Sequence, residues 1–293
     1  MKNQFSKVIL GTVQLGMPYG LGLWKNEMMP EATAFSILDA AWNGGITTLD
    51  TSSNYGVAEE RIAKFMRLNP SKNFDLISKV KSINNDKNLY IRVRDIVRGN
   101  PILGLDNCSS FSLLLHSEAD ILRVDLVAAL DKLVANGEIS QWGVSLYDCR
   151  STEIAAKIEG CKIVQLPFGF LNQSFGVEGC INKLRLHGKL VHCRSVFTKG
   201  LLFTAATSKD PFGLSSKNFF SLASERGVSP ANLALSFVTS THGVASAVVG
   251  VDQSSHLNDL FESALLKLEK TEVAEINKLA SHAILDNVRP EKW

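Results

Sequence analysis

The chain has 293 residues, of which 45% are hydrophobic and 20% are charged, a composition typical of a folded soluble protein with a large core. Its net charge of +2 is too small to favour a nucleic acid or an anionic membrane surface as the partner. No apolar run approaches the ~20 residues of a membrane span, and the N-terminus lacks the apolar region and cleavage site of a signal peptide. We therefore expect a cytoplasmic protein that binds neither a membrane nor nucleic acid.

The cysteines are scattered along the chain, with no CxxC pair and no Cys/His spacing typical of zinc. A reducing cytoplasm keeps such thiols reduced. We expect no metal site, and free buried thiols at Cys108, Cys149, Cys161, Cys180 and Cys193.

Short apolar runs alternate with helical stretches along the whole chain, which is the pattern of a parallel sheet built from βα units. The predicted strands cover residues 8-14, 47-52, 74-80, 110-116, 141-147, 162-168, 190-197 and 246-251. The clearest predicted helices cover residues 30-44, 57-69, 119-137 and 152-160, and another begins at Ser229-Pro230. Eight such units without a break in composition predict a closed (β/α)8 TIM barrel, whose active site lies at the C-terminal ends of its strands.

We expect a single domain over residues 1-293, with two segments added to the repeating unit. Residues 198-220 are too long for a simple βα turn, so they predict a long loop that covers a ligand at the barrel mouth. A tail of about residues 283-293 follows the last helix and ends in Trp293.

Polar residues close three early strands of the predicted barrel. The runs ITTLDTSSNYG, DLISKV and FSLLLHS place Asp50 and Tyr55, then Lys79, then His116 at strand ends. A phenol acts as an acid near neutral pH only if its pKa of about 10 is lowered, and a neighbouring ammonium has that effect. Lys79 would supply this charge, Asp50 would hold the lysine, and His116 would orient a substrate oxygen.

Taken singly, these residues have ordinary explanations, such as a turn for Asp50, the surface for Lys79 and core packing for Tyr55 and His116. Other chemistries find no support, because the chain has no GxGxxG, GxxxxGK[ST], HExxH or GxSxG motif. The joint occurrence of the four residues at successive strand ends favours a site.

Together they resemble the catalytic tetrad of the aldo-keto reductase family. GITTLDTSSNYGVAEERIAKF is similar to the family signature around its Asp and Tyr, and DLISKV and SLLLHS are similar to its Lys and His strands. The resemblance extends to LGTVQLG, GVSLY, VQLPF, RSVFTKGLL and VVGVDQSSHLNDL. It implies an enzyme that transfers a hydride from NADPH to an aldehyde or ketone without metal or flavin. Tyr55 would donate the proton, and His116 would orient the carbonyl.

The resemblance also implies a set of cofactor-binding residues in the second half of the chain. Ser145 and Gln165 match positions that bind the nicotinamide carboxamide, and Arg194 stands where many members stack a tyrosine on the nicotinamide ring. A planar guanidinium can stack likewise. The pyrophosphate and its covering loop would be lined by Ser195, Phe197, Lys199 and Gly200, and the adenosine end of the cofactor would lie at Gly250, Val251, Asp252, Ser254, His256 and Asp259.

The eighth unit departs from the commonest pattern of NADPH-dependent members, which carry Lys or Arg there. This chain has Asp252 and His256, with Asp259 one turn further on. A carboxylate disfavours a 2'-phosphate and can bind a free ribose hydroxyl. NADPH is the expected cofactor, and NADH stays open as the alternative.

The substrate pocket is expected to draw on Gln14, Met17, Trp24, Phe168 and Phe170. LGTVQLGMPYG and RSVFTKGLL resemble a bacterial subgroup associated with sugar and surface-polysaccharide metabolism, which implies a small-molecule carbonyl substrate that is sugar-like or a nucleotide sugar. We expect a monomer or weak oligomer. The first alternative function is a nucleotide-sensing regulatory or scaffold subunit on the same fold, and a more remote one is a barrel isomerase or lyase that needs no cofactor.

Overall fold

Eight parallel strands form a closed barrel in the computed structural model, which describes residues 6–80, 83, 88–204, 211–258, 260–261 and 266–280. The strands are β1 (Val8–Gly11), β2 (Thr48–Asp50), β3 (Phe74–Val80), β4 (Cys108–Leu115), β5 (Gln141–Ser145), β6 (Cys161–Pro167), β7 (Leu190–Arg194) and β8 (Val244–Val249). Each strand pairs with the next, and β1 closes the barrel by pairing with β8, where Val8 lies opposite Ala247. The predicted (β/α)8 barrel is confirmed.

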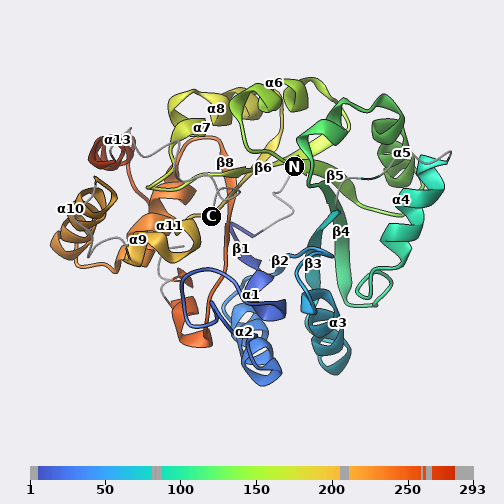
Figure 1. Ribbon diagram of the computed structural model, residues 1–293, viewed down its shortest axis with the longest axis horizontal. Coiled ribbons are helices and arrows are strands. Elements are labelled where there is room, and N and C mark those ends of the chain that lie inside the picture. The colour runs from blue at the N-terminus through green and yellow to red at the C-terminus, as the bar shows by residue number, and fades with distance from the viewer. Residues whose placement is uncertain are drawn as a thin grey trace.

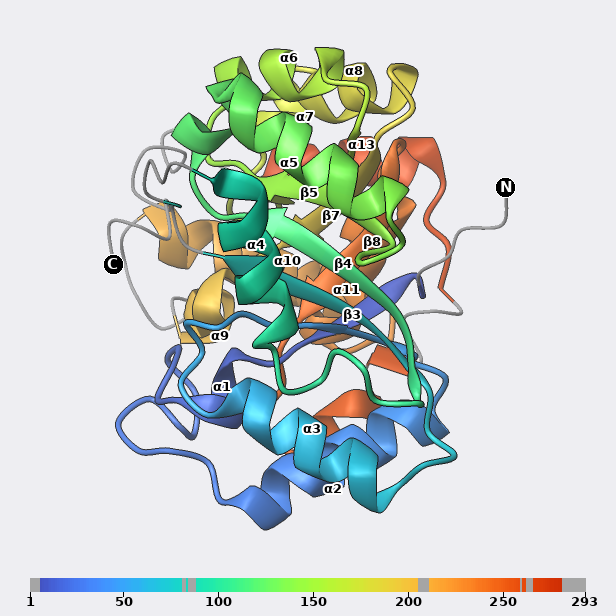
Figure 2. The same cartoon turned by 90° about the vertical axis from the view of Figure 1, so that its right-hand side faces the viewer.

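Helices surround the strands as an outer ring (Figure 1). They are α1 (Val13–Gly16), α2 (Glu31–Asn43), α3 (Ala58–Leu68), α4 (Leu89–Arg98), η1 (Glu118–Leu122), α5 (Val124–Ala135), α6 (Cys149–Lys157), α7 (Ser174–Val177), α8 (Cys180–Leu186), η2 (Thr198–Gly200), α9 (Leu201–Thr204), α10 (Pro211–Glu225), α11 (Pro230–Ser240), η4 (Ser254–His256) and α13 (Lys270–Leu279). Figure 2 shows α4 and α5 side by side on the outside of the barrel. Within the described residues, no helix has the length and apolar character needed to cross a membrane.

Two predicted helices differ from the observed ones in their boundaries. The helix expected over residues 119-137 is interrupted at Arg123, whose extended backbone (φ −87°, ψ 101°) separates η1 from α5. The helix expected over residues 152-160 begins at Cys149, because the side chain of Asp148 accepts a hydrogen bond from the Ser151 amide and caps the first turn.

The loop expected over residues 198-220 is largely helical where the structure describes it. It contains η2, α9 and the first part of α10, and residues 205–210 lie outside the described residues. Helix α10 begins at Pro211, a residue favoured in the first helical turn, and it buries Phe219 and Ala223. The expected tail over residues 283-293 also lies outside the described residues.

The core has two parts. The larger part fills the space between strands and helices, and a smaller cluster consists of Ile9, Ile77, Leu114, Ile163 and Val248. Side chains alternate along a strand, so Ile77 shares the barrel-facing side of β3 with Lys79. This apolar layer therefore supports the polar residues at the C-terminal ends of the strands.

A disulfide joins Cys149 at the start of α6 to Cys180 at the start of α8, with 5.9 Å between the Cα atoms. The expectation of five free thiols is therefore wrong for these two residues. The pair could not be predicted because its spacing of 31 residues matches no motif, and only the packing of α6 against α8 brings the sulfurs together. Cys161 and Cys193 are free and buried, and Cys108 is free and partly exposed.

Candidate active site

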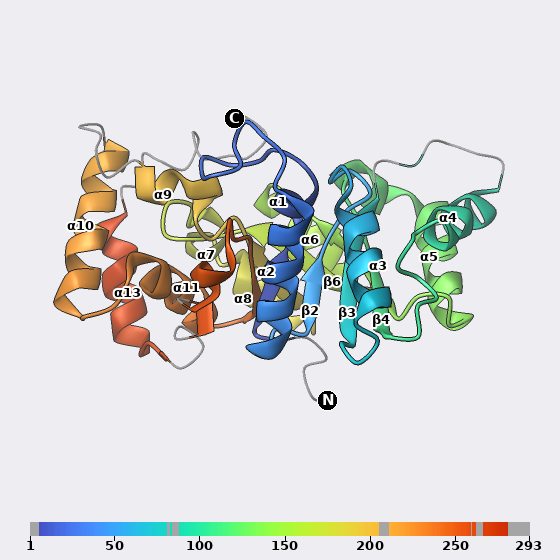
Figure 3. The ribbon, with the colours of Figure 1, turned by 90° about the horizontal axis from the view of Figure 1, so that it is seen from below.

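The four residues predicted to carry the chemistry line one cavity of about 310 Å³ at the C-terminal ends of the strands. Asp50 is the last residue of β2, Lys79 lies near the end of β3, and His116 directly follows β4. Tyr55 comes from the turn between β2 and α3. A side view shows that α1 and α9, which follow β1 and β7, lie at the same end of the barrel (Figure 3).

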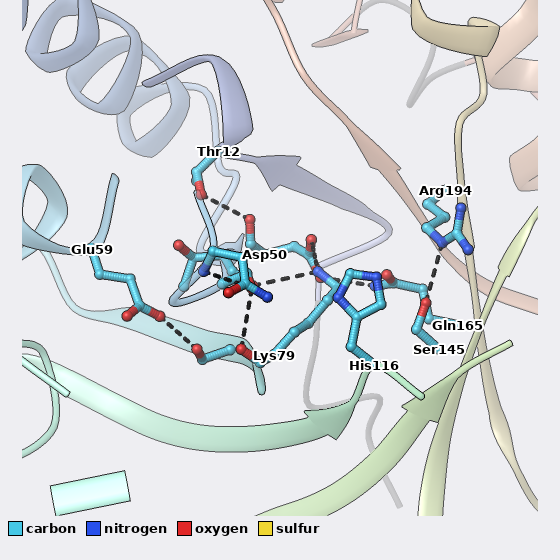
Figure 4. Close-up of polar contacts among 12 residues, drawn as sticks. Thr12, Asp50, Glu59, Lys79, His116, Ser145, Gln165 and Arg194 are labelled. Atoms are coloured by element: carbon cyan, nitrogen blue, oxygen red, sulfur yellow. Dashed lines mark hydrogen bonds and ion pairs between the residues drawn. The ribbon is translucent and has the colours of Figure 1, made fainter. Parts of the chain in front are cut away.

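A buried ion pair forms the base of this cavity. The Lys79 ammonium contacts one carboxylate oxygen of Asp50, and these residues are only 1% and 3% exposed. The other oxygen accepts a hydrogen bond of 2.8 Å from Nε2 of Gln165 (Figure 4). Burial lowers the pKa of Lys79, and the carboxylate of Asp50 opposes that shift. The charges of lysine and aspartate are thus balanced within the barrel.

Tyr55 lies beside the pair, with Nζ of Lys79 5.4 Å from the centroid of its ring. Two glycines shape the turn that carries Tyr55. A Cβ at Gly16 would lie 2.0 Å from the carbonyl oxygen of Tyr55, and Gly56 has a φ of 56°, which favours glycine.

The acidity of Tyr55 differs from the expectation. Burial and the Asp50 carboxylate raise the pKa of its phenol, and the charge of Arg194 opposes this increase. The net direction of the shift is therefore opposite to the lowering that the sequence predicts from Lys79. The phenol is therefore protonated at neutral pH.

His116 is a neutral imidazole. Burial, Lys79 and Arg194 lower its pKa to about 4. Its Nε2 lies 3.0 Å from the hydroxyl of Tyr147, and the two rings are nearly parallel, with an angle of 4° between their planes. A neutral imidazole has one donor and one acceptor nitrogen, so His116 can donate a hydrogen bond to a carbonyl oxygen.

Arg194, the last residue of β7, reaches across to the end of β5. Its Nε donates to Oγ of Ser145 at 3.3 Å, and its Nη2 donates to the carbonyl oxygen of Leu146 at 3.4 Å. Its guanidinium carbon lies 4.4 Å from the centroid of the Tyr147 ring. Figure 4 shows this reach beside His116 and Gln165.

A second cavity of about 350 Å³ adjoins the first, and both are lined by Gln14, Tyr19, Phe197, Lys199, Gly200 and Gly250. Of the remaining predicted cofactor residues, Val251, Asp252 and His256 line the second cavity, whereas Ser145, Arg194 and Ser195 line the first. The two cavities therefore form one continuous cleft across the barrel mouth. The volume of each cavity lies within the range of about 300 to 1,000 Å³ that is usual for ligand sites.

The turn after β7, which lines this cleft, has an unusual backbone. Ser195, Thr198 and Lys199 have φ values of 60°, 51° and 55°, and they are the non-glycine residues with positive φ in the described part of the chain. Gly200 follows with a φ of 96°. Left-handed conformations at side-chain-bearing residues are costly, and they cluster at functional sites.

The loop between α1 and α2 is tied across the cleft. The Leu21 amide donates to the carbonyl oxygen of Lys199 at 2.9 Å. The Leu23 amide donates to Oδ2 of Asp252 at 3.0 Å, and Nε1 of Trp24 donates to the backbone oxygen of Asp252 at 2.7 Å. Asp252 and Trp24 therefore fasten this loop, and Trp24 does not belong to the residues that line either cavity.

The cleft fits a nicotinamide dinucleotide in its polar groups as well as in its extent. Oε1 of Gln165 and Oε1 of Gln14 are buried acceptors without a hydrogen-bond partner. A carboxamide nitrogen is a suitable donor for Gln165, although Gln165 is fully buried and is not among the residues that line either cavity. A Cβ at Gly250 would lie 2.4 Å from Oε1 of Gln14, so a larger residue where the two cavities meet would displace the end of the Gln14 side chain.

Other predicted residues lie elsewhere. Phe168 stacks on Phe237 with 5.6 Å between centroids, and Phe170 stacks on Phe219 at 4.2 Å, so both belong to the core and not to the cavity lining. Met17 is also not among the lining residues, while Gln14 is.

Two positions of the eighth unit differ as well. Oγ of Ser254 lies at the surface, 3.3 Å from Oγ of Ser36, and does not line the cleft. Asp259 lies outside the described residues.

Two tyrosines that line the cavity were not predicted, Tyr147 and Tyr19. Tyr147 follows the end of β5, so the rule that located His116 after β4 could have located it as well. Tyr19 lies in an irregular loop, and no sequence signal distinguishes it.

Comparison with known proteins supports the geometry. The aldo/keto reductase family model matches residues 7–281. A Klebsiella pneumoniae aldo/keto reductase, solved in complex with NADP and acetate, is 22% identical over 95% of this chain and 93% of that chain, with a TM-score of 0.72. A glycerol dehydrogenase from Gluconobacter oxydans is 19% identical over 94% of this chain and 91% of that chain, with a TM-score of 0.75. The search of curated proteins finds no significant match.

Proposed function

Because this chain belongs to the aldo/keto reductase family and is an NAD(P)H-dependent oxidoreductase, we propose that it reduces a sugar-like aldehyde or ketone with Tyr55 as the proton donor. The observation that carries the proposal is the convergence of Tyr55, His116 and the Asp50–Lys79 pair on one cavity that continues into a second.

When bound, the reduced nicotinamide supplies a hydride to the carbonyl carbon, so negative charge grows on the carbonyl oxygen. His116, as a neutral imidazole, donates a hydrogen bond to that oxygen and fixes its angle. Tyr55 donates the proton. The phenol carries this proton at neutral pH, because burial and the Asp50 carboxylate raise its pKa, and the alkoxide that the hydride transfer creates takes the proton up.

We assign the nicotinamide half of the cofactor to the first cavity, with Gln165 and Ser145 at its carboxamide. Lys199, Gly200 and Gly250 lie where the two cavities meet, which suits the pyrophosphate. The adenosine half would then lie in the second cavity beside Val251 and His256.

NADPH is the proposed cofactor, with NADH as the alternative. The question turns on Asp252, which lines the second cavity and uses one carboxylate oxygen for the Leu23 amide. Asp252→Arg should shift the preference towards NADPH if the residue faces the adenosine ribose, and titration of the variant with both nucleotides measures that shift.

The test of the function combines nucleotide binding with turnover. We expect NADPH or NADH to quench protein fluorescence with a micromolar Kd, and aldehydes to be reduced. In Tyr55→Phe, nucleotide affinity should stay within about threefold while kcat falls at least about 100-fold, because the variant keeps the ring and loses the donated proton. Unchanged turnover in this variant would refute the role of Tyr55, and failure of both nucleotides to bind below millimolar levels would refute the function.

A further inference from the structure

The catalytic cavity carries an excess of positive charge. Of the described residues that line it, Asp50 is the carboxylate, whereas Lys79, Arg194 and Lys199 are cations. Asp50 is already paired with Lys79, and His116 is neutral at pH 7. The charge of Arg194 is therefore not balanced by a carboxylate of the described lining.

Arg194 and Lys199 occupy different parts of the cleft. Lys199 lines both cavities, so it stands where the phosphates of a dinucleotide would pass. Arg194 lines the catalytic cavity and not the second one. A guanidinium in the catalytic cavity can hydrogen-bond a group that is bound close to the reacting carbonyl.

Arg194 is held for this task by neutral groups. Ser145 and Leu146 each accept one hydrogen bond through oxygen, and the Tyr147 ring packs against the guanidinium plane. Within the described part of the chain, no carboxylate lies within ion-pair distance of Arg194, and its Nη1 makes no hydrogen bond. A guanidinium presents five N–H donors in a planar fork that matches a carboxylate or a phosphate.

We propose that the substrate carries a carboxylate or phosphate group within a few atoms of its carbonyl, and that Arg194 binds this anion. Tyr147 lies between the anion-binding residue and the carbonyl-orienting residue, because its ring packs against Arg194 while its hydroxyl lies 3.0 Å from Nε2 of His116. The carbonyl oxygen at His116 and the anion at Arg194 would then lie on either side of this tyrosine. The inference rests on the proposed reductase function.

The test compares matched pairs of aldehydes in the wild-type protein. Succinic semialdehyde is paired with its neutral methyl ester, and glyceraldehyde 3-phosphate with glyceraldehyde. We expect kcat/KM to be at least about 10-fold higher for the charged member of one pair or both, mainly through KM, since hydrogen bonds to charged groups are worth a factor of this size or more. The pair with the larger ratio identifies the anion as a carboxylate or a phosphate.

Variants then assign the preference to a residue. In Arg194→Gln the charged-to-neutral ratio should fall towards one, and Arg194→Lys should keep part of it. Lys199→Gln is the matched control, and it should weaken nucleotide binding while the ratio of the two substrates is kept. The inference is overturned if Arg194→Gln raises the nucleotide Kd and lowers kcat/KM by the same factor for all four aldehydes, because the guanidinium would then serve the cofactor.

The wild-type comparison decides the question by itself even if a variant fails to fold. If nucleotides bind and neutral aldehydes are reduced with no preference for the charged partner, this inference alone is wrong. If no nucleotide binds, the proposed function and the inference fall together.

Discussion

Replacement of Asp50 by Asn should destabilise the protein in a way that depends on pH. The variant leaves Lys79, which is 1% exposed, without its counter-ion. A buried, unpaired ammonium gives up its proton on folding. The unfolded chain keeps the ordinary lysine pKa of 10.5, so it binds one proton more than the folded variant below that value, and stability rises with pH.

The size of the destabilisation follows from the proton that the unfolded variant binds and the folded variant does not. Each pH unit below the ordinary lysine pKa costs about 1.36 kcal/mol, which gives a loss of about 5 kcal/mol at pH 7 and about 2 kcal/mol at pH 9. The larger value agrees with the ~3–5 kcal/mol typical of a broken buried ion pair.

Urea denaturation followed by tryptophan fluorescence at both pH values measures these losses. Asp39→Asn is the control, since Asp39 pairs with Lys72 but its side chain is 49% exposed, and its removal should cost under about 1 kcal/mol at either pH. A loss for Asp50→Asn that is equal at pH 7 and pH 9 would show that Lys79 keeps its proton, and the reasoning would be wrong.

Two further predictions concern the disulfide and the loop over the cleft. Reduction of Cys149–Cys180 should lower the free energy of unfolding by about 3 kcal/mol, because the bond closes a loop of 31 residues in the unfolded chain; denaturation with and without dithiothreitol measures this, and Cys108→Ser should respond to the reductant like the wild type. Gly22→Ala should raise the nucleotide Kd several-fold, because its Cβ would lie 1.9 Å from Oδ2 of Asp252 and displace the carboxylate that holds the Leu23 amide. Gly160→Ala is the matched control, since its Cβ would lie 1.9 Å from Oδ1 of Asp131 at a position that lines neither cavity; it should bind the nucleotide normally, and equal affinities for the two variants would contradict the role of the loop.

The barrel and the residues at the ends of β2, β3 and β4 could be predicted because both leave local signals. An apolar run gives the strand, and a polar residue at its end gives a position on the C-terminal face, so Asp50, Lys79 and His116 follow from one rule. Tyr147 obeys the same rule after β5, yet the resemblance drew attention to Ser145 instead.

Other features depend on contacts between distant segments, which a sequence does not display. Phe168 follows β6 as His116 follows β4, but its ring faces Phe237 in the core. The pKa of Tyr55 depends on its burial and on the charges of Asp50 and Arg194, whose positions only the folded chain defines. The partner of Cys149 likewise depends on the packing of α6 against α8.

The closure of the barrel by β1 and β8 also determines when the site can form during synthesis. Oγ of Ser246 donates a hydrogen bond to the backbone oxygen of Ser6, 240 residues earlier in the chain. Such distant contacts form slowly, and a ribosome releases the last strand long after the first. A nascent chain therefore carries Tyr55 before Gly250 and Asp252 exist to complete the second cavity. The cleft is therefore completed only after the eighth strand and the residues that follow it have been made.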